Sequence, residues 1–282
     1  MPEGPEIRRA ADRIGRVLVG RTLSEVYFGL ERLKPFEGML RGATVETVTT
    51  HGKAMLTHFA NGLTLYSHNQ LYGRWYVCRR GRTPATTRTL RVGLHTAAAS
   101  ALLFSASDID VLPRTELQQH PFLSRLGPDV LDDSLAWRDV AGDLSRSRFA
   151  GRSLAALYLD QHFLAGIGNY LRSEILFAAG LHPWLRPRDL TRGQIGRLAR
   201  STLEISRRAY ATAGITNRPR RVRRLQRQGA TRRDYRFAVF ARAGLPCYDC
   251  GTTIQRASAG SRRIYFCPAC QARPDCQVRP DC

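Results

Sequence analysis

Two Cys-x-x-Cys pairs constrain the fold of this chain more than any other feature of its sequence. Cys247 and Cys250 form the first pair, Cys267 and Cys270 form the second, and 16 residues separate the pairs. Two intervening residues let both thiolates of a pair bind one tetrahedral ion, and the stretch between the pairs is long enough for a β-hairpin. A redox role is the alternative for a single pair of this kind. Two copies at this spacing favour one structural zinc ion held by four cysteines.

The other three cysteines constrain the fold less. Cys78 is expected to be a small, buried hydrophobic residue. Cys276 and Cys282 belong to a tail, residues 273–282, in which the sequence Arg-Pro-Asp-Cys occurs twice. The sequence assigns no role to this tail.

The chain carries a large excess of positive charge. Its 44 basic and 23 acidic residues give a formal net charge of +21. An excess of this size indicates a polyanionic partner, for which nucleic acid is the usual choice. Only Lys34 and Lys53 are lysines. Arginine keeps its proton near neutral pH whereas lysine can release it, so each lysine is a candidate for chemistry.

The charge is concentrated toward the C-terminus, where residues 201–282 hold 17 arginines against 5 acidic residues. The densest run extends from Arg218 to Arg236. Such a run is either a solvated linker or a phosphate-binding segment. Because it leads directly into the cysteine pattern, phosphate binding by the region as a whole is favoured.

Composition excludes several classes of protein. With 43% hydrophobic and 24% charged residues, the bulk of the chain is not disordered. No stretch approaches the roughly 20 apolar residues that span a bilayer. The N-terminal segment MPEGPEIRRA has charges where a signal peptide needs its apolar core, which predicts a cytosolic protein.

Hydrophobic periodicity predicts an α+β protein in which a β domain precedes a helical domain. A helix is expected from Pro5 to Val19, followed by an antiparallel sandwich or barrel. The expected strands are Thr22–Phe28, Thr44–Thr49, Ala54–Phe59, Leu63–Ser67, Trp75–Cys78, Thr89–Leu94 and Ala101–Phe104. The expected helices after the boundary near 115–130 are Leu131–Leu144, Ser153–Asp160 (with Ser153 as N-cap), Tyr170–Ala179 and Arg192–Ala211.

This organisation gives five expected parts. They are a β domain over 1–120, a helical domain over 125–217, an arginine-rich connector over 218–237, a zinc hairpin over 238–272 and the tail over 273–282.

The segment Met1-Pro2-Glu3 permits two interpretations. Removal of Met1 would expose Pro2 as a secondary amine that is partly unprotonated at neutral pH and can attack the anomeric carbon of a sugar. The iminium ion formed would favour elimination, with Glu3 moving protons. Alternatively, Pro then Glu is a favourable way to begin a helix. The segment by itself favours the helix start.

Four segments together resemble the superfamily of bacterial DNA glycosylase/AP lyases that contains formamidopyrimidine-DNA glycosylase and endonuclease VIII (Nei). They are MPEGPEI, LTLYSHNQLYGRW, FLAGIGNYLRSE and the two cysteine pairs, and the resemblance extends to about residue 271. It implies a two-lobed fold. The first lobe is a β-sandwich with an N-terminal helix, and the second contains a helix–two-turn–helix domain and a zinc-finger hairpin, with DNA between the two lobes.

The resemblance implies roles for residues that the sequence leaves open. Pro2 would be the Schiff-base nucleophile, Glu3 the proton donor, and Lys53 would assist β-elimination, although alone it would pass for a surface lysine. Arg262 would clamp phosphates and assist δ-elimination. Its neighbour Arg263 is the alternative.

Further residues would contact DNA or lie near the pocket. Gln70, Leu71 and Tyr72 would form a wedge that fills the space left by an extruded nucleotide. The implied phosphate contacts are Arg125 and Asn169, and the implied pocket acids are Glu6 and Glu174.

The resemblance therefore implies a bifunctional glycosylase and lyase of base excision repair, expected to act as a monomer on duplex DNA with oxidised bases or abasic sites, in the bacterial cytosol. Gly4 and the Asn-Gln-Leu-Tyr wedge resemble the pyrimidine-directed endonuclease VIII branch, which implies oxidised pyrimidines as the substrate. A purine-directed formamidopyrimidine-DNA glycosylase is the alternative within the family. A non-catalytic zinc-finger DNA-binding protein is the alternative outside it. Structural zinc is the one expected cofactor.

Overall fold

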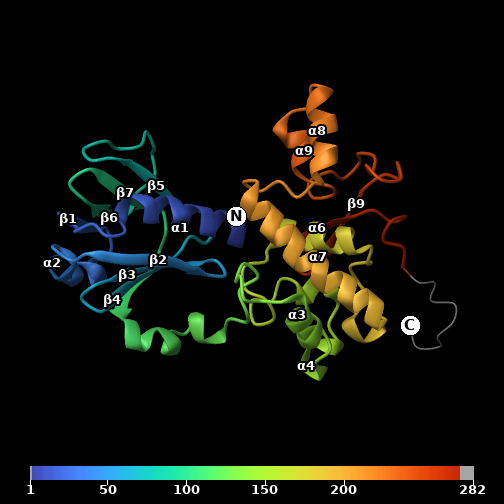
Figure 1. Ribbon diagram of the computed structural model, residues 1–282, viewed down its shortest axis with the longest axis horizontal. Coiled ribbons are helices and arrows are strands. Elements are labelled where there is room, and N and C mark those ends of the chain that lie inside the picture. The colour runs from blue at the N-terminus through green and yellow to red at the C-terminus, as the bar shows by residue number, and fades with distance from the viewer. Residues whose placement is uncertain (1, 274–282) are drawn as a thin grey trace. The chain divides into compact units, whose positions relative to one another are not determined.

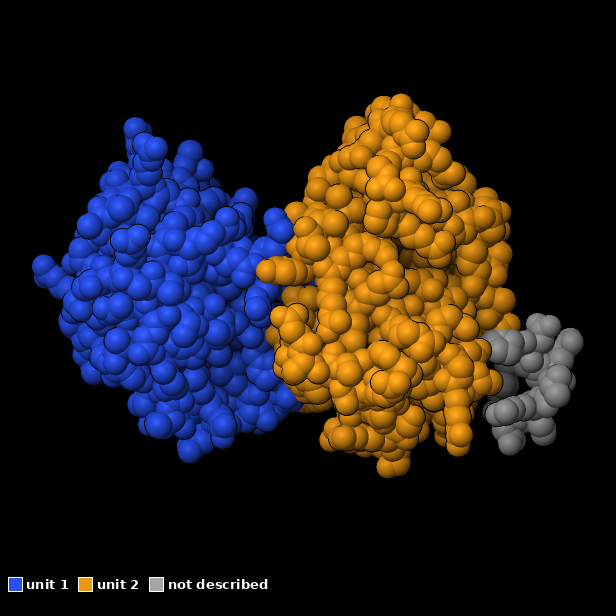
Figure 2. Space-filling model, viewed as in Figure 1, with its two compact units in different colours: residues 1–126 blue, residues 127–282 orange. Residues whose placement is uncertain are grey.

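The computed structural model describes residues 2–273, which belong to two compact units (Figure 2). Unit 1 comprises residues 1–126 and unit 2 residues 127–282. The junction falls in the stretch where strand patterns give way to helix patterns. Met1 and the tail from 274 onward, with Cys276 and Cys282, lie outside the described residues.

Unit 1 contains two antiparallel sheets of four strands each, in the orders β1-β6-β7-β5 and β2-β3-β4-β8 (Figure 1). The strands are β1 (Glu25–Phe28), β2 (Val45–His51), β3 (Ala54–Phe59), β4 (Leu63–His68), β5 (Arg74–Arg79), β6 (Leu90–His95), β7 (Ala99–Phe104) and β8 (Asp108–Pro113). The helices are α1 (Gly4–Leu18), η1 (Glu31–Leu33), α2 (Pro35–Leu40), η2 (Arg114–Gln119) and η3 (Leu123–Arg125).

The N-terminal helix α1 completes the core of unit 1. Its residues Ile7, Ala11, Ile14 and Leu18 are almost fully buried and share one hydrophobic cluster with strands of both sheets. The chain leaves the helix through Gly20, whose φ of 73° suits glycine. The predicted helix is confirmed. It fixes the start of the chain against the sandwich.

Two expectations for unit 1 need correction. Strand β8 was not predicted, because Asp108 and Asp110 alternate with the buried Ile109 and Val111, and aspartate is rare in strands. Cys78 is only partly buried, because β5 is an edge strand. Its thiol donates a hydrogen bond to the carbonyl of Arg82, 3.0 Å away.

Unit 2 combines helices with a β-hairpin around a shared core. The helices are α3 (Trp137–Leu144), α4 (Ser147–Ala150), α5 (Leu154–Leu157), α6 (Asn169–Ala179), η4 (Pro187–Asp189), α7 (Arg192–Ala211), α8 (Pro219–Arg227) and α9 (Arg232–Arg236). The hairpin consists of β9 (Gln255–Ala259) and β10 (Arg262–Phe266). Ile264 of β10 belongs to the same buried cluster as α6 and α7, so the hairpin and the helices fold together.

The helices agree with the sequence where apolar spacing is continuous, as in α6 and α7. The expected helix Leu131–Leu144 is wrong over its first part, and α3 begins only at Trp137. The side chains of Asp129 and Asp132 accept hydrogen bonds from the backbone two residues on, which favours turns over helix. Ser153 caps α5 as predicted, although α5 is shorter than expected.

The arginine-rich run is folded. It forms α8 and α9, and neither helix contains a fully buried residue. Among the residues that the structure describes, no helix has the length and apolar character required to cross a membrane.

Candidate active site and metal centre

The start of the chain is held by the first turn of α1. Glu3 is the N-cap, and its backbone N–H donates to Oε2 of Glu6 over 3.1 Å, as in a capping box. Glu3 is only 3% exposed. The helix-start interpretation of Pro2-Glu3 is therefore physically realised, and it leaves Pro2 immediately outside the helix, where its position is fixed.

Pro2 lines two adjoining hollows of unit 1. A narrow crevice is lined by Pro2, Ile7, Lys53, His68, Asn69 and Gln70. A larger cavity of about 300 Å³ is lined by Pro2 and Glu6 together with Leu71, Tyr72 and further residues of α1 and β5. Residues from the start of the chain, the β2–β3 turn and the β4–β5 loop thus meet within one unit.

Lys53 reaches the crevice because of a tight turn. Gly52, with φ of 61°, joins β2 to β3, and Lys53 follows it directly. Lys53 is 9% exposed, which is low for a lysine. The interpretation of Lys53 as an ordinary surface lysine is therefore wrong.

His68 is a neighbour that the sequence analysis did not single out. Its Nδ1 lies 3.5 Å from Oδ2 of Asp108 on the adjacent strand β8. Burial is the main cause that lowers the pKa of His68, and the charge of Lys53 lowers it further, against the opposing effect of Asp108. Burial and the charge of Lys53 therefore both favour the neutral form of the imidazole. The sequence could have identified His68 through its position in the motif Ser67-His68-Asn69, next to the expected wedge.

The expected wedge lies at the tip of the β4–β5 loop. Leu71 is 62% exposed and Tyr72 is 69% exposed, although both side chains are large and apolar in part. Gly73 closes the loop through a hydrogen bond from its N–H to the carbonyl of Asn69, at 2.7 Å. A Cβ on Gly73 would lie 2.6 Å from that oxygen, so only glycine fits. Gln70 adopts a positive φ of 49°, and its Oε1 accepts a hydrogen bond from Ser107.

The two expected phosphate-binding residues belong to different units. Arg125 is an exposed residue at the end of η3 in unit 1. Asn169 begins α6 in unit 2, and its Oδ1 accepts a hydrogen bond of 2.6 Å from Arg172. Arg172 is completely buried and also donates to the carbonyls of Ala155 and Arg263. Arg172 thus connects Asn169 to the hairpin.

Arg262 and Arg263 begin strand β10, and both are exposed. Because side chains alternate across a strand, the two arginines point to opposite faces of the hairpin. Arg262 shares its face with Ile264, which packs into the core of unit 2.

Glu174 lies within unit 2 and is 2% exposed. Its carboxylate accepts hydrogen bonds from the backbone N–H groups of Ala238, Val239 and Phe240, each at 2.8 Å, and from the hydroxyl of Thr216. These contacts hold the segment that enters the finger against α6. They give Glu174 a structural task, and its expected place near the catalytic pocket stays a prediction.

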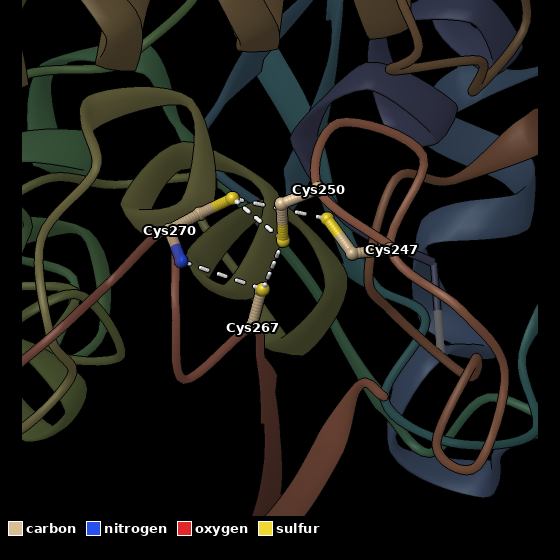
Figure 3. Close-up of side chains that lie close together, drawn as sticks. All are labelled: Cys247, Cys250, Cys267 and Cys270. Atoms are coloured by element: carbon tan, nitrogen blue, oxygen red, sulfur yellow. Dashed lines mark hydrogen bonds between the residues drawn. The ribbon is translucent and has the colours of Figure 1, made fainter. Parts of the chain in front are cut away.

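The four cysteine thiols converge on one point (Figure 3). Their sulfur atoms all lie within 4.8 Å of one another, and the sulfur of Cys250 lies 3.4 Å from those of Cys267 and Cys270. Cys247 and Cys270 are separated by 3.9 Å. Sulfurs bound to zinc at about 2.3 Å form a tetrahedron with edges of about 3.8 Å. The cluster therefore has the size of a four-thiolate metal site.

The acid–base chemistry of the cluster also fits a cation. Hydrogen bonds from Thr252 lower the pKa of Cys250 to about 6. Burial, reinforced by neighbouring thiols, raises the pKa of Cys267 and Cys270. Adding a second negative thiolate beside the first is unfavourable without a positive ion between them.

Models of known families match both units. The formamidopyrimidine-DNA glycosylase N-terminal domain matches residues 1–107, and the formamidopyrimidine-DNA glycosylase H2TH domain matches residues 126–220. Curated relatives include Endonuclease 8 of Escherichia coli, 50% identical over 271 residues, which cover 96% of this chain and 100% of the relative. Endonuclease 8 of Salmonella arizonae is 48% identical over the same coverage.

Solved structures share the fold. A complex of Lactococcus lactis Fpg (MutM) with DNA containing N7-benzyl-Fapy-dG superposes with a TM-score of 0.80 at 19% identity, covering 96% of this chain and 100% of that one. A complex of the same enzyme with DNA containing an oxidised pyrimidine gives a TM-score of 0.79 at 20% identity, with the same coverage.

Proposed function

Because the chain belongs to the superfamily of formamidopyrimidine-DNA glycosylase and endonuclease VIII, we propose that it excises oxidised pyrimidines from duplex DNA through Pro2 and then cleaves the strand. The protein is a DNA glycosylase/AP lyase of base excision repair. The preference for pyrimidines rests on Gly4 and the Asn-Gln-Leu-Tyr wedge, and it fits the identity of about 50% to relatives named Endonuclease 8. One observation carries the proposed mechanism, namely that Pro2 and Lys53 line the same crevice of unit 1.

The proposed reaction begins with attack by the nitrogen of Pro2 on C1′ of the damaged nucleotide. The bond from C1′ to the base breaks, and the base leaves with the proton that the nitrogen of Pro2 gives up on bonding to C1′. Glu3 donates a proton to the sugar oxygen as the ring opens, which leaves an iminium ion between Pro2 and C1′. The iminium acidifies the C2′ hydrogen, so it serves as the electron sink without any other cofactor.

Two eliminations complete the cycle. In β-elimination, loss of the C2′ proton expels the 3′ phosphate, and Lys53, which lines the crevice, assists this step. In δ-elimination, the 5′ phosphate is then expelled while Arg262 binds that phosphate. Hydrolysis of the iminium releases the sugar fragment and restores Pro2. The product is a one-nucleotide gap with phosphate ends.

The remaining assignments concern binding. We propose that Gln70, Leu71 and Tyr72 fill the space that the extruded nucleotide leaves, because exposed apolar side chains at a loop tip recover part of the unstacking cost. Arg125 and Asn169 contact phosphates. Glu6 supports Glu3 from the first turn of α1.

We propose zinc as the ion of the cysteine cluster, with Cys247, Cys250, Cys267 and Cys270 as its ligands. Four thiolates leave no open coordination position, so the ion would stabilise the finger and take no part in catalysis. The protein is proposed to act as a monomer in the bacterial cytosol. Light scattering after gel filtration would test the monomeric state.

Borohydride trapping on abasic-site DNA tests the mechanism. Wild-type protein is expected to become covalently linked to the DNA, with the link located at Pro2 by peptide mass spectrometry. Strand cleavage without any trapped complex would contradict the mechanism. A non-catalytic DNA-binding protein would give neither product.

A lesion panel tests the substrate. Thymine glycol is expected to be excised faster than oxidised guanine opposite cytosine, with undamaged duplex as the control. The reverse order would identify a purine-directed glycosylase.

A further inference from the structure

Helix α8 carries a stripe of arginines that the proposed reaction does not use. Arg220, Arg223, Arg224 and Arg227 are spaced i, i+3, i+4 and i+7 and lie within an arc of about 100° on one face of the helix. All four are exposed. The half-buried Val222 and Leu225 lie outside that arc, so α8 has an inner apolar side and an outer cationic side.

The described part of the chain offers the stripe no acidic partner. Across residues 2–273, none of its four arginines forms an ion pair with an aspartate or glutamate. The first turn of α8 has no acidic residue either, and Arg220 lies at the positive end of the helix dipole. Like charges at these spacings repel each other on a helix. The outer face of α8 is therefore arranged to receive negative charge from another molecule.

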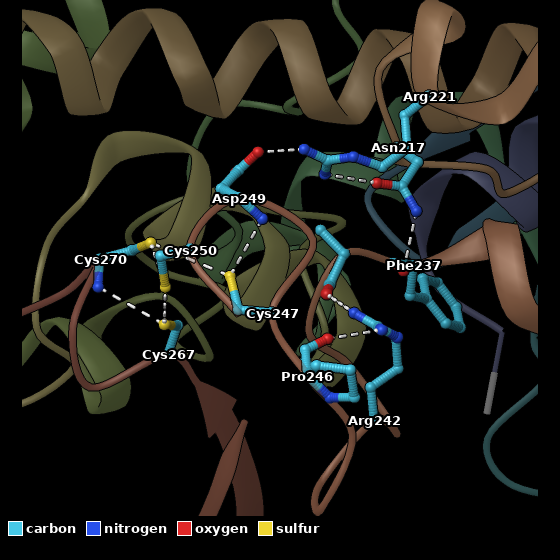
Figure 4. Close-up of polar contacts among 11 residues, drawn as sticks. Asn217, Arg221, Phe237, Arg242, Pro246, Cys247, Asp249, Cys250, Cys267 and Cys270 are labelled. Carbon is cyan, nitrogen blue, oxygen red and sulfur yellow. Dashed lines mark hydrogen bonds and ion pairs between the residues drawn. The ribbon is translucent and has the colours of Figure 1, made fainter. Parts of the chain in front are cut away.

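Helix α8 is fixed to the cysteine finger (Figure 4). Arg221, on the inner side, forms an ion pair with Asp249 and donates to Oδ1 of Asn217 over 3.0 Å. The amide of Asn217 in turn donates to the carbonyls of Tyr235 and Phe237, which anchors the end of α9.

On the finger, the residues that contact α8 and α9 are Tyr248 and Asp249, which lie between Cys247 and Cys250. Asp249 receives Arg221, and its N–H donates to the sulfur of Cys247. The hydroxyl of Tyr248 donates to the carbonyl of Asp234 in α9, at 2.7 Å, while Arg242 stacks on the Tyr248 ring at 3.5 Å. The stripe consequently holds a fixed position relative to the hairpin that carries Arg262.

We propose that the arginine stripe of α8 is a second phosphate-binding surface that contacts the backbone of duplex DNA outside the lesion. The stripe extends about 10 Å along the helix axis, and B-DNA presents one phosphate charge per about 1.7 Å of its own axis. Arginine keeps its charge and forms forked hydrogen bonds with phosphate. This inference rests on the proposed function, because duplex DNA is its ligand.

The salt dependence of binding to undamaged duplex tests the stripe. The variant R220Q/R223Q/R224Q/R227Q keeps good helix formers on exposed positions. The control R138Q/R148Q/R188Q/R192Q removes the same charge from exposed arginines of α3, α4, η4 and α7. The slope of log K against log salt is expected to become shallower by about 0.9 per lost phosphate contact, and so by up to roughly 3.6 for the stripe variant. The control variant is expected to change the slope by less than the roughly 0.9 that one phosphate contact contributes.

Equal slopes for the stripe variant and the control would overturn the proposal and would leave an acidic protein as the alternative ligand. Replacing the same four arginines with lysine is expected to restore the slope, because lysine also neutralises phosphate. D249N is expected to weaken DNA binding with unchanged metal content, and wild-type affinity in D249N would refute the anchoring role. Failure of the proposed function is recognised separately, by wild-type protein that gives no borohydride-trapped complex.

Discussion

The two units of this chain use positive charge in different ways. In unit 1 the cation of interest is Lys53, which is 9% exposed and lines a crevice with Pro2. In unit 2 every cationic side chain is arginine apart from histidines, and the stripe of α8 faces solvent. Both lysines of the chain lie in unit 1.

In the functions proposed above, this difference separates chemistry from binding. A group that moves protons must be able to titrate and must be held where little water competes. A group that binds a phosphate backbone needs a permanent charge and access from outside. The finger also differs from the rest of the protein in what stabilises it, because unit 1 and the helices of unit 2 each have a large apolar core whereas the finger has a small one beside four thiols.

The largest effect is expected at the N-terminus of unit 1. Extending the chain with residues that remain attached ahead of Pro2 turns its nitrogen into an amide, which is not nucleophilic. Lyase activity and borohydride trapping are expected to fall by roughly 10⁴- to 10⁶-fold, because the nucleophile is lost. Affinity for undamaged duplex is expected to stay the same.

Pro2→Gly is the matched control, since it keeps an α-amine at the terminus. It is expected to retain measurable trapping. An extended protein that cleaves abasic sites at the normal rate would remove the basis of the comparison, because the chemistry would then not reside at Pro2.

Removing the metal is expected to act on unit 2 alone. Cys267→Ser, or chelation, is expected to unfold the finger, because a structural four-cysteine site contributes on the order of 10 kcal/mol of metal-binding free energy to folding. Hydrogen exchange resolved by peptide should rise over residues 239–273 and not in the sandwich. Cys78→Ser, outside the cluster, is the control. A chelated protein with a protected finger would show that no ion stabilises it.

Exchanging the buried lysine tests whether the charge or its ability to titrate matters. Lys53→Arg keeps the charge and is expected to slow β-elimination by about 100-fold with little change in KM, as for loss of a general acid–base group. Lys34→Arg is the control, because Lys34 pairs with Glu37 at the surface and lines neither hollow. Equal rates for the two variants would assign Lys53 to binding.

Shortening the wedge is expected to have a moderate effect. Leu71→Ala should slow excision from duplex by about tenfold, because part of the unstacking cost of a few kcal/mol is no longer recovered. Cleavage of a preformed abasic site should change less. Met39→Ala provides an exposed apolar control in the same unit. Identical losses on both substrates would indicate a folding defect instead.

Acidification is expected to have the smallest effect and to fall mainly on unit 1. Burial lowers the pKa of His58, His68 and His95 there, and of His182 in unit 2. The unfolded chain takes up protons near pH 6.5, whereas in the folded state these histidines take up protons only at a lower pH. The free energy of unfolding should therefore fall as the pH drops from 7.5 to 5.5.

Urea unfolding of the zinc-loaded protein at the two pH values measures this. The loss is at most about 1.4 kcal/mol per pH unit for each proton. His58→Gln should make the dependence of the unfolding free energy on pH shallower, by at most the contribution of one proton. Stability that rises on acidification would contradict the assigned direction of these shifts.

Much of the fold follows from local patterns in the sequence. The apolar spacing of α1 and α7 specifies helices with one buried face, and seven of the eight strands of the sandwich were located. The errors arose where a few side chains act against the pattern. Asp129 and Asp132 bind nearby backbone groups and delay the start of α3, and the aspartates of β8 concealed a strand.

The candidate site divides along the same line. The cysteine spacing alone indicated a four-ligand metal site, because the geometry is set within each pair and the hairpin between them. The contacts of Glu174 could not be read from the sequence, because three of its partners are backbone groups more than 60 residues away along the chain and the fourth is the hydroxyl of Thr216.

The sequence by itself determined most of the helices and strands and the cluster of four cysteines, since these depend on neighbours within a few residues. Only the tertiary structure decided which polar groups are removed from solvent, among them Lys53 in a crevice and Arg172 between α6 and the hairpin, and that Arg221 is half-buried against the finger. Burial depends on contacts between residues far apart in the chain. Local spacing therefore identifies the arginines of α8, and only the packed structure shows which of them anchor the helix and which face solvent.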